Sequence, residues 1–340
     1  MRPFTYERPV NVQAAVAAAS HLAKPLVPPT QSPAQFIGGG TNLADYMKLG
    51  VAQPERLVDL NGLDDAGLRR IQVDDKRIVF GALVRMSDAA AHEEVRRRCP
   101  LVAESLVLAA SGQIRNMATL GGNVLQRTRC EYFRETSWAC NKREPGSGCA
   151  AMDGFNRQHA VLGGSDQCIA TYHGDFAQAL IALDASVVVE GQHGSRKIAF
   201  ADLHRLPGDT PNIETVLGPA DIIVAIEVPL GPWSGRSRYL KIRDRESYAF
   251  ALASAAVALD MDGGTVRHAR IALGGVATVP WRAKKAEEAL LGKVLNEGAA
   301  HAAAEAAFAD ARPREHNAFK IPLGKSTLVR ALLETRDMKV

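Results

Sequence analysis

The sequence has few cysteines, few aromatic residues, little net charge and no long apolar run. Five cysteines in 340 residues are far fewer than a disulfide-stabilised scaffold contains, which excludes that class. The 41 basic and 37 acidic residues leave a net charge of +4, which does not indicate binding to nucleic acid or to an anionic membrane surface. No apolar stretch approaches the roughly 20 residues that cross a bilayer, so the sequence predicts no membrane insertion.

What remains is a composition typical of a globular protein, with 46% hydrophobic and 23% charged residues. Its length predicts two or three domains. Residues 1–8 lead into a polar segment that has no continuous apolar run and no small-residue cleavage site. We therefore expect that, if the protein is exported, a partner carries the export signal.

A glycine turn lies near the N-terminus. A predicted strand at residues 35–37 enters the turn at residues 38–43, Gly-Gly-Gly-Thr-Asn-Leu, and a predicted short helix follows at residues 44–49. Successive backbone N–H groups in front of a helix N-terminus suit a diphosphate. The pattern is neither a P-loop nor the Gly-x-Gly-x-x-Gly fingerprint. A turn that binds no ligand is equally compatible with these residues.

A second turn at residues 116–123 repeats this chemistry. It combines small residues, which allow a ligand to approach closely, with threonine and asparagine side chains that can form hydrogen bonds. Two such loops in adjoining α/β units predict a site that grips one extended dinucleotide between them. Because no Rossmann fingerprint is present, the sequence gives no preference for NAD.

The C-terminal third has a different pattern. Prolines at positions 207, 211 and 219 indicate a boundary. Strand patterns at residues 222–228, 239–243 and 266–273 are followed by alanine-rich helical patterns at residues 283–291 and 299–311. We therefore expect a three-stranded antiparallel sheet packed on helices.

Four of the five cysteines lie within 39 residues, in a segment with little apolar periodicity. They are Cys130, Cys140, Cys149 and Cys168. Four thiolates suit a [4Fe–4S] cluster and also tetrahedral zinc. The wide spacing lacks the close Cys-x2–4-Cys pairs that are usual at zinc sites. From the residues alone, a cluster, zinc, and unliganded or disulfide-linked cysteines all remain open.

Basic and histidine residues surround these cysteines. The basic residues are Arg127, Arg129, Lys142 and Arg143. Their charge would favour thiolates and offset an anionic cluster, and a solvated basic loop is the alternative interpretation. For His159 and His173 we expect structural hydrogen bonds rather than metal ligation. Cys99 stands apart at a predicted helix end, where we expect no ligand role.

These motifs resemble the FAD-binding subunit of molybdenum hydroxylases, the xanthine dehydrogenase and carbon monoxide dehydrogenase group. The resemblance lies in residues 36–43 and 118–123, and in a C-terminal part that spans residues 239–283, so it covers nearly the whole chain. The cysteine segment is similar to that of the FAD subunit of bacterial three-subunit periplasmic aldehyde oxidoreductases. The matching stretches are 126–130, 140–143, 145–150 and 168–171.

The resemblance implies an α+β fold of the vanillyl-alcohol-oxidase (PCMH) type. Two α/β FAD-binding subdomains, residues 1–60 and 61–218, would precede a C-terminal domain, residues 219–340, with the three-stranded sheet and helices. The cysteine insert, residues 127–168, would lie in the second subdomain. By position, the implied FAD contacts are Gln35, Phe36, Ile37, Gly38, Gly39, Gly40, Thr41, Asn42, Leu43, Thr119, Gly122, Asn123, Asp175, Ile223, Val224 and Lys241. Asp175 would bind the ribityl hydroxyls, Ile223 or Val224 would lie near the flavin ring and Lys241 near its polar edge. The four cysteines of the insert would hold a [4Fe–4S] cluster.

The resemblance also implies a function. No Ser-His-Asp, His-Glu-x-x-His or paired-carboxylate pattern is present, so we expect FAD rather than a side chain to be the reactive group. The expected role is electron transfer in a molybdenum-dependent aldehyde oxidoreductase. Electrons would come from a molybdenum-cofactor large subunit and a [2Fe–2S] small subunit of a heterotrimer and pass to an acceptor such as oxygen or a quinone.

Three alternatives remain open at this point. The first is the flavin subunit of a related hydroxylase that acts on xanthine, an aromatic acyl-CoA or an N-heterocycle. The second is an assembly scaffold with a structural metal loop, and the third is a self-sufficient flavin oxidase. The resemblance implies a periplasmic location, reached by co-export with a signal-bearing partner, and a cytoplasmic location is the alternative.

Overall fold

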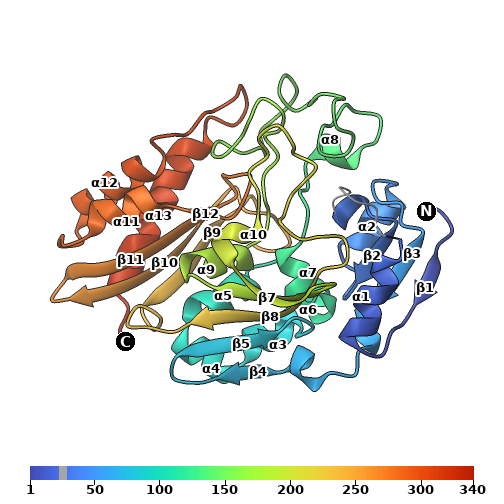
Figure 1. Ribbon diagram of the computed structural model, residues 1–340. Helices are drawn as coiled ribbons and strands as arrows, with labels where there is room; N and C mark the ends of the chain where they lie inside the picture. Colours follow the sequence, from blue (N-terminus) through green and yellow to red (C-terminus); the bar gives the residue numbers. More distant parts are fainter. Residues whose placement is uncertain (23–28) are drawn as a thin grey trace.

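The structure is a computed structural model that describes residues 1–22 and 29–340. Three sheets organise these described residues, each with its own helices (Figure 1). The N-terminal unit contains β1 (Thr5–Glu7), α1 (Val12–Ser20), β2 (Ala34–Ile37), α2 (Leu43–Lys48) and β3 (Arg56–Asp59). Its strands are parallel and run in the order β1-β3-β2. Asn11 caps helix α1, whose alanine and valine side chains are buried against this sheet.

The central sheet is antiparallel, with the order β4-β5-β8-β6-β7. Its strands are β4 (Ile71–Val73), β5 (Arg77–Gly81), β6 (Ser186–Gly191), β7 (Gly194–Ala199) and β8 (Ile222–Pro229). The helices beside it are α3 (Met86–Ala91), α4 (Glu93–Arg98), α5 (Pro100–Val107), α6 (Gly112–Met117), α7 (Leu120–Val124), α9 (Phe176–Ala182) and α10 (Phe200–Leu203). Helices α3 and α4 are separate because the backbone of His92, between them, is extended.

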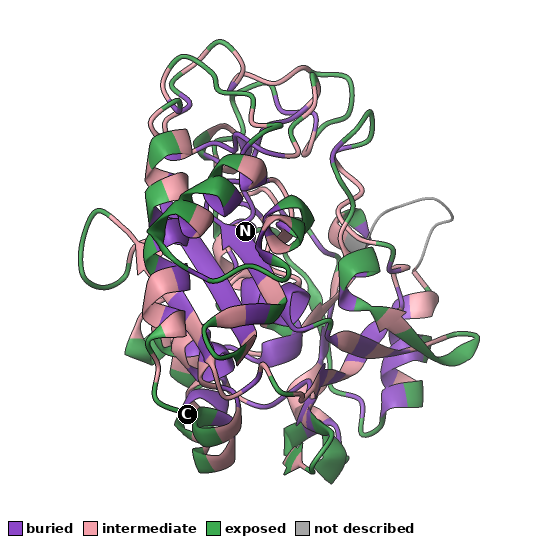
Figure 2. Cartoon of the chain, turned by 90° about the vertical axis from the view of Figure 1, so that its left-hand side faces the viewer, coloured by how far each residue is buried: buried purple, intermediate pink, exposed green. Residues whose placement is uncertain are grey.

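The C-terminal sheet is also antiparallel, with the order β12-β11-β10-β9. Its strands are β9 (Ser237–Ile242), β10 (Ala253–Asp262), β11 (Thr265–Gly274) and β12 (Trp281–Arg282). Helices α11 (Lys284–Leu290), α12 (Glu297–Ala307) and α13 (Lys320–Arg336) lie together beside it (Figure 1). Figure 2 shows much of this sheet buried beneath its helices.

The prediction for this sheet was wrong in two respects, because the sheet has four strands rather than three and one of the predicted strands lies elsewhere. Residues 222–228 belong to β8, which pairs with β5 and β6 in the central sheet, and β10 takes a place in the C-terminal sheet instead. The sequence did not reveal β10, because its residues 253–259 are buried throughout and therefore lack the alternation of a half-buried strand. Helix α13 was also missed, since Pro322 and Gly324 interrupt its pattern.

The cysteine insert is mostly irregular, as expected, with one short helix, α8 (Glu131–Arg134). It lies at one end of the molecule, between the N-terminal unit and the C-terminal helices (Figure 1). Buried hydrogen bonds hold it on both sides: Tyr46 of α2 donates to the Thr128 carbonyl, and Asn317 donates to the His159 and Ala160 carbonyls. No helix in the described residues is both long and apolar enough to cross a bilayer.

Candidate functional site: two adjoining cavities

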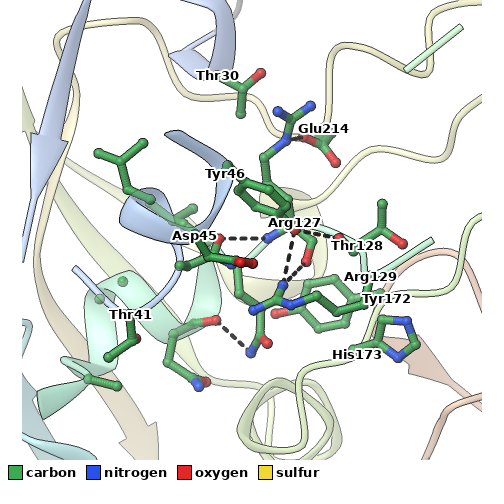
Figure 3. Close-up of a pocket in the computed structure, with 18 of the residues that line it drawn as sticks. Thr30, Thr41, Asp45, Tyr46, Arg127, Thr128, Arg129, Tyr172, His173 and Glu214 are labelled. Carbon is green, nitrogen blue, oxygen red and sulfur yellow. Dashed lines mark hydrogen bonds and ion pairs between the residues drawn. The ribbon is translucent and has the colours of Figure 1, made fainter. Parts of the chain in front are cut away.

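A cavity of about 890 Å³ lies where the N-terminal unit, the central unit and the insert meet. Figure 3 shows polar side chains from all three parts turned toward one another around it. Most of the predicted cofactor contacts line this cavity: Gln35, Phe36, Ile37, Gly38, Gly39, Gly40, Thr41, Asn42, Leu43, Thr119, Gly122, Asn123, Asp175 and Ile223. Val224 and Lys241 do not line it.

The two glycine loops contact each other on one wall of the cavity. A Cβ atom on Gly39 would lie 2.0 Å from the Met117 carbonyl oxygen, and one on Gly38 would lie 2.8 Å from the Thr119 hydroxyl. Gly40 has a φ of +72°, which L side chains rarely adopt. Glycine at position 39 is therefore required by loop-to-loop packing, a reason that the sequence pattern does not reveal.

The polar side chains of the loops have local partners. The Thr119 hydroxyl accepts a hydrogen bond from the Gly122 N–H at 3.3 Å and so caps α7, whose N-terminus faces the cavity. Asn42 does not cap α2; its amide group lies against Arg127 and Arg129 of the insert. Asn42 thus links the first glycine loop to the insert.

Asp175 is buried at the start of α9 with both carboxylate oxygens engaged. One oxygen accepts from the Tyr239 hydroxyl at 2.7 Å, and the other pairs with the Lys241 ammonium at 2.8 Å. Lys241 also donates to the Leu108 carbonyl, and only 1% of its side chain is exposed. Burial raises the pKa of Asp175, and Lys241 opposes that rise. Lys241 therefore lies behind Asp175 and supports its charge from outside the cavity.

Of the two residues of β8 predicted to lie near the flavin ring, only one is found at the cavity. Ile223 lines the cavity, whereas Val224 packs toward the core under α1. The pairing of β6 with β8 is irregular here, since Val189 lies opposite Ile223 and Val188 opposite Ala225, which leaves Val224 as the extra residue of a bulge.

A group of ion pairs between partly buried side chains forms the wall on the insert side (Figure 3). The Glu214 carboxylate pairs with Arg127 at 2.5 Å and with Lys142 at 3.0 Å. Burial raises the pKa of Glu214, but Arg127 and Lys142 outweigh that effect and hold it below its usual value. Two cations and one anion leave this wall positive, which suits a negatively charged ligand.

Several polar atoms of the cavity are buried and have no hydrogen-bond partner among the described residues. They are Thr30 Oγ1, Asn123 Oδ1, Arg127 Nη2, His159 Nδ1, His173 Nδ1 and His204 Nδ1. Unpaired buried polar groups cost about 1–3 kcal/mol each, so their concentration here indicates a site for a polar ligand.

A second, much smaller cavity lies inside the insert. All four cysteines of the insert line it, together with aromatic side chains such as Tyr132 and Phe133. Cys130, Cys140 and Cys168 are buried, and Cys149 is partly exposed. No group of three or more His, Cys, Asp or Glu side chains within residues 1–22 and 29–340 is arranged around a single metal ion. The sulfurs therefore surround one space without converging on one point.

The sulfurs lie among apolar side chains together with the polar side chains of Asn141, Lys142 and Gln167. Burial raises the pKa of Cys130 to about 12 and that of Cys168 to about 11, so a metal centre would have to displace thiol protons on binding. His159 Nε2 lies 3.1 Å from the Cys130 sulfur. Burial also lowers the pKa of His159 to about 4, which keeps its ring neutral near pH 7. Cys99 lies at the end of α4, as predicted, and is buried in the central core.

Two family models together match nearly the whole chain. The FAD binding domain in molybdopterin dehydrogenase matches residues 2–231, and the CO dehydrogenase flavoprotein C-terminal domain matches residues 238–335. The chain is an FAD-binding subunit of the molybdenum hydroxylase family.

Members of this family resemble the chain along its full length. The aldehyde oxidoreductase FAD-binding subunit PaoB of Escherichia coli (strain K12) is 48% identical over 338 residues, which are 99% of each chain. The carbon monoxide dehydrogenase medium chain of Hydrogenophaga pseudoflava is 30% identical over 92% of this chain and 88% of its own. The reconstituted CO dehydrogenase from Oligotropha carboxidovorans matches in structure with a TM-score of 0.76 at 25% identity, over 98% of both chains. The predicted family, fold class and oxidoreductase role are confirmed.

In this FAD-binding subunit, sequence reasoning missed part of the cavity wall. Tyr46, Glu214 and Phe250 line the cavity, yet no local motif marks them. Arg129 lies over the rings of Tyr46 and Phe250, with its guanidinium carbon 5.5 Å and 5.7 Å from the ring centres. These contacts join residues far apart in the sequence, so no local pattern could have revealed them.

Proposed function

We propose that this chain is the FAD-binding electron-transfer subunit of a molybdenum-dependent aldehyde oxidoreductase. Its partners would be a molybdenum-cofactor large subunit and a [2Fe–2S] small subunit in a heterotrimer. The observation that carries the proposal is the cavity lined by both glycine loops, in a chain 48% identical along its whole length to a subunit named for aldehyde oxidation.

The residues around the large cavity fit FAD. Backbone N–H groups of the two glycine loops would hold the diphosphate, and the N-terminus of α7 adds a favourable dipole. Asp175 would accept hydrogen bonds from the ribityl hydroxyls while Lys241 keeps its carboxylate charged. Ile223 would supply an apolar surface to the ring system. Bound FAD would supply the redox chemistry, taking up electrons from the partners and passing them to oxygen or a quinone.

We also propose that Cys130, Cys140, Cys149 and Cys168 hold a [4Fe–4S] cluster. Support comes from their lining one cavity and from their wide spacing in the sequence, which lacks the close cysteine pairs usual at zinc sites. Such a cluster would join distant parts of an insert that has little regular structure of its own, which favours a structural role. Metal analysis distinguishes a [4Fe–4S] cluster from zinc, because a zinc site would contain neither iron nor acid-labile sulfide.

The location stays a proposal as well. We propose a periplasmic location, reached by co-export with a signal-bearing partner, and a cytoplasmic location is the alternative. Fractionation of cells that express all three subunits distinguishes the two compartments.

The experiment that tests the function uses the co-expressed complex under anaerobic conditions. Addition of an aldehyde should bleach the visible absorption of the bound flavin, because electrons from the partner subunits reach it. Xanthine, an aromatic acyl-CoA and an N-heterocycle serve as comparisons. Bleaching by one of these compounds and not by aldehydes would indicate that the chain is the flavin subunit of a related hydroxylase. Absence of flavin from the complex would favour an assembly scaffold.

A further inference from the structure

The imidazole ring of His159 is buried beside the sulfur of Cys130. His159 is 3% exposed, and its Nε2 lies 3.1 Å from Cys130 Sγ. Its Nδ1 has no hydrogen-bond partner among the described residues. The cysteine sulfur is therefore the polar partner of this ring, which would otherwise carry the full cost of its desolvation.

The C-terminal part of the chain fixes the position of this ring. Asn317, which is fully buried, donates to the His159 carbonyl at 3.3 Å and to the Ala160 carbonyl at 3.2 Å. Lys320, at the start of α13, donates to the Gln158 carbonyl at 2.9 Å. These bonds hold the backbone on both sides of His159, and they therefore fix the point from which the ring reaches the sulfur.

The contact with His159 is distinctive among the four sulfurs. Cys168 Sγ accepts a backbone N–H, that of Ala170, at 3.4 Å. The nearby Lys142 ammonium is occupied by Glu214 and the Pro211 carbonyl rather than by sulfur. Within the described part of the chain, no other side chain donates a hydrogen bond to any of these sulfurs.

We propose that His159 is a positioning residue that donates its Nε2–H to the Cys130 sulfur and thereby raises the reduction potential of the metal centre. The inference rests on the proposed [4Fe–4S] cluster. A ligating thiolate can only accept, so the neutral ring must carry its hydrogen on Nε2. Because reduction makes the centre more negative, a donor to the sulfur stabilises the reduced state more than the oxidised one.

The position of Cys130 places this hydrogen bond next to the proposed flavin site. Cys130 lines both the small cavity and the large one, and His159 lines the large one. The hydrogen bond therefore acts on the ligand of the centre that faces the flavin site. Helix α13 and the residues before it would in this way influence the centre through His159.

The test is a redox titration of the complex followed by the electron paramagnetic resonance signal of the reduced cluster. His159→Phe keeps a flat ring without a donor. We expect its cluster to have a lower potential, with the ratio of reduced to oxidised cluster decreased by up to about tenfold at a fixed potential, or 59 mV for a one-electron couple. His159→Gln retains a donor and should stay nearer to the wild type. An unchanged potential in His159→Phe with full iron content would overturn the inference.

His204 offers a matched control. It lines the same large cavity, but its Nε2 contacts the Val124 carbonyl at 2.9 Å instead of a sulfur. His204→Phe should leave the cluster potential unchanged, and an equal shift in both variants would overturn the specific role of His159.

If His159→Phe loses its iron, the hydrogen bond from His159 to the cluster ligand is tested in the wild-type complex instead. With 15N-labelled histidine, pulsed resonance of the reduced cluster should show coupling to an imidazole nitrogen, and its absence would overturn the inference. Wild-type protein without iron and acid-labile sulfide would refute the proposed cluster, and the inference with it.

Discussion

We expect the Asp175 carboxylate to have two roles, pairing with the buried Lys241 ammonium and binding FAD, and substitutions should distinguish them. It is 5% exposed and pairs with Lys241, whose side chain is 1% exposed, at 2.8 Å. In Asp175→Ala the ammonium would remain buried with the Leu108 carbonyl as its partner. Removing one member of a buried pair costs about 3–5 kcal/mol, so we expect thermal unfolding of the flavin-free chain at a clearly lower temperature.

The second role is the binding of FAD. Loss of hydrogen bonds to a charged acceptor, about 1.5–3 kcal/mol, should weaken FAD binding roughly ten- to hundredfold. The double variant Asp175→Ala with Lys241→Met removes the unpaired charge and should recover most of the stability but not the affinity, which is measured by titration of the flavin-free protein with FAD. If the double variant bound FAD as tightly as the wild type, Asp175 would have a structural role only. If Asp175→Ala unfolded like the wild type, the buried pair would not stabilise the fold.

Three further predictions follow from single contacts. Gly39→Ala places a Cβ 2.0 Å from a backbone oxygen of the facing loop, which should cost about 1–3 kcal/mol of stability and reduce the FAD content of the purified protein. Gly112→Ala meets no atom of the described residues within 4 Å and should retain FAD. Equal FAD content in the two variants would contradict the packing of the two loops as the reason for Gly39. Cys140→Ser should remove iron and destabilise the insert, while Cys99→Ser keeps its iron; full iron in Cys140→Ser would show that the ligand set is wrong. Burial lowers the pKa of Lys320 to about 7, so between pH 7 and about 10.4 the unfolded chain holds one proton more than the folded chain. The free energy of unfolding of the wild type should therefore rise with pH by up to about 1.4 kcal/mol per pH unit relative to that of Lys320→Met. Urea unfolding at pH 7 and pH 9 measures this, and an equal difference between the two proteins at both pH values would contradict it.

The sequence was most informative where local chemistry decides the structure. Both glycine loops and the cap at Asn11 are recognisable because a turn or a helix start needs those residue types in that order. The choice between Ile223 and Val224 could not be made, since it depends on which face of β8 meets the cavity. Strand β10 could not be predicted either, because residues 253–259 are buried on both faces and therefore show no alternation of apolar and polar residues.

The remaining parts of the site depend on long-range contacts. Glu214 pairs with Arg127 across 87 positions, and Asn317 reaches the carbonyl of His159 across 158. No pattern around Glu214 distinguishes it from other acidic residues of the same proline-rich stretch. Lys241 was expected near the ligand and lies one layer behind it, because Asp175 takes the position at the cavity.

The central claim is that the two adjoining cavities hold FAD and an iron–sulfur cluster. The most direct test is the absorption spectrum of the anaerobically purified chain, co-expressed with its partner subunits and separated from them, before and after addition of dithionite. We expect structured flavin bands on a broad iron–sulfur absorption, both bleached by the reductant. Flavin bands without the broad background would assign the four cysteines to zinc or to free thiols, and a folded chain with neither signal would contradict the account.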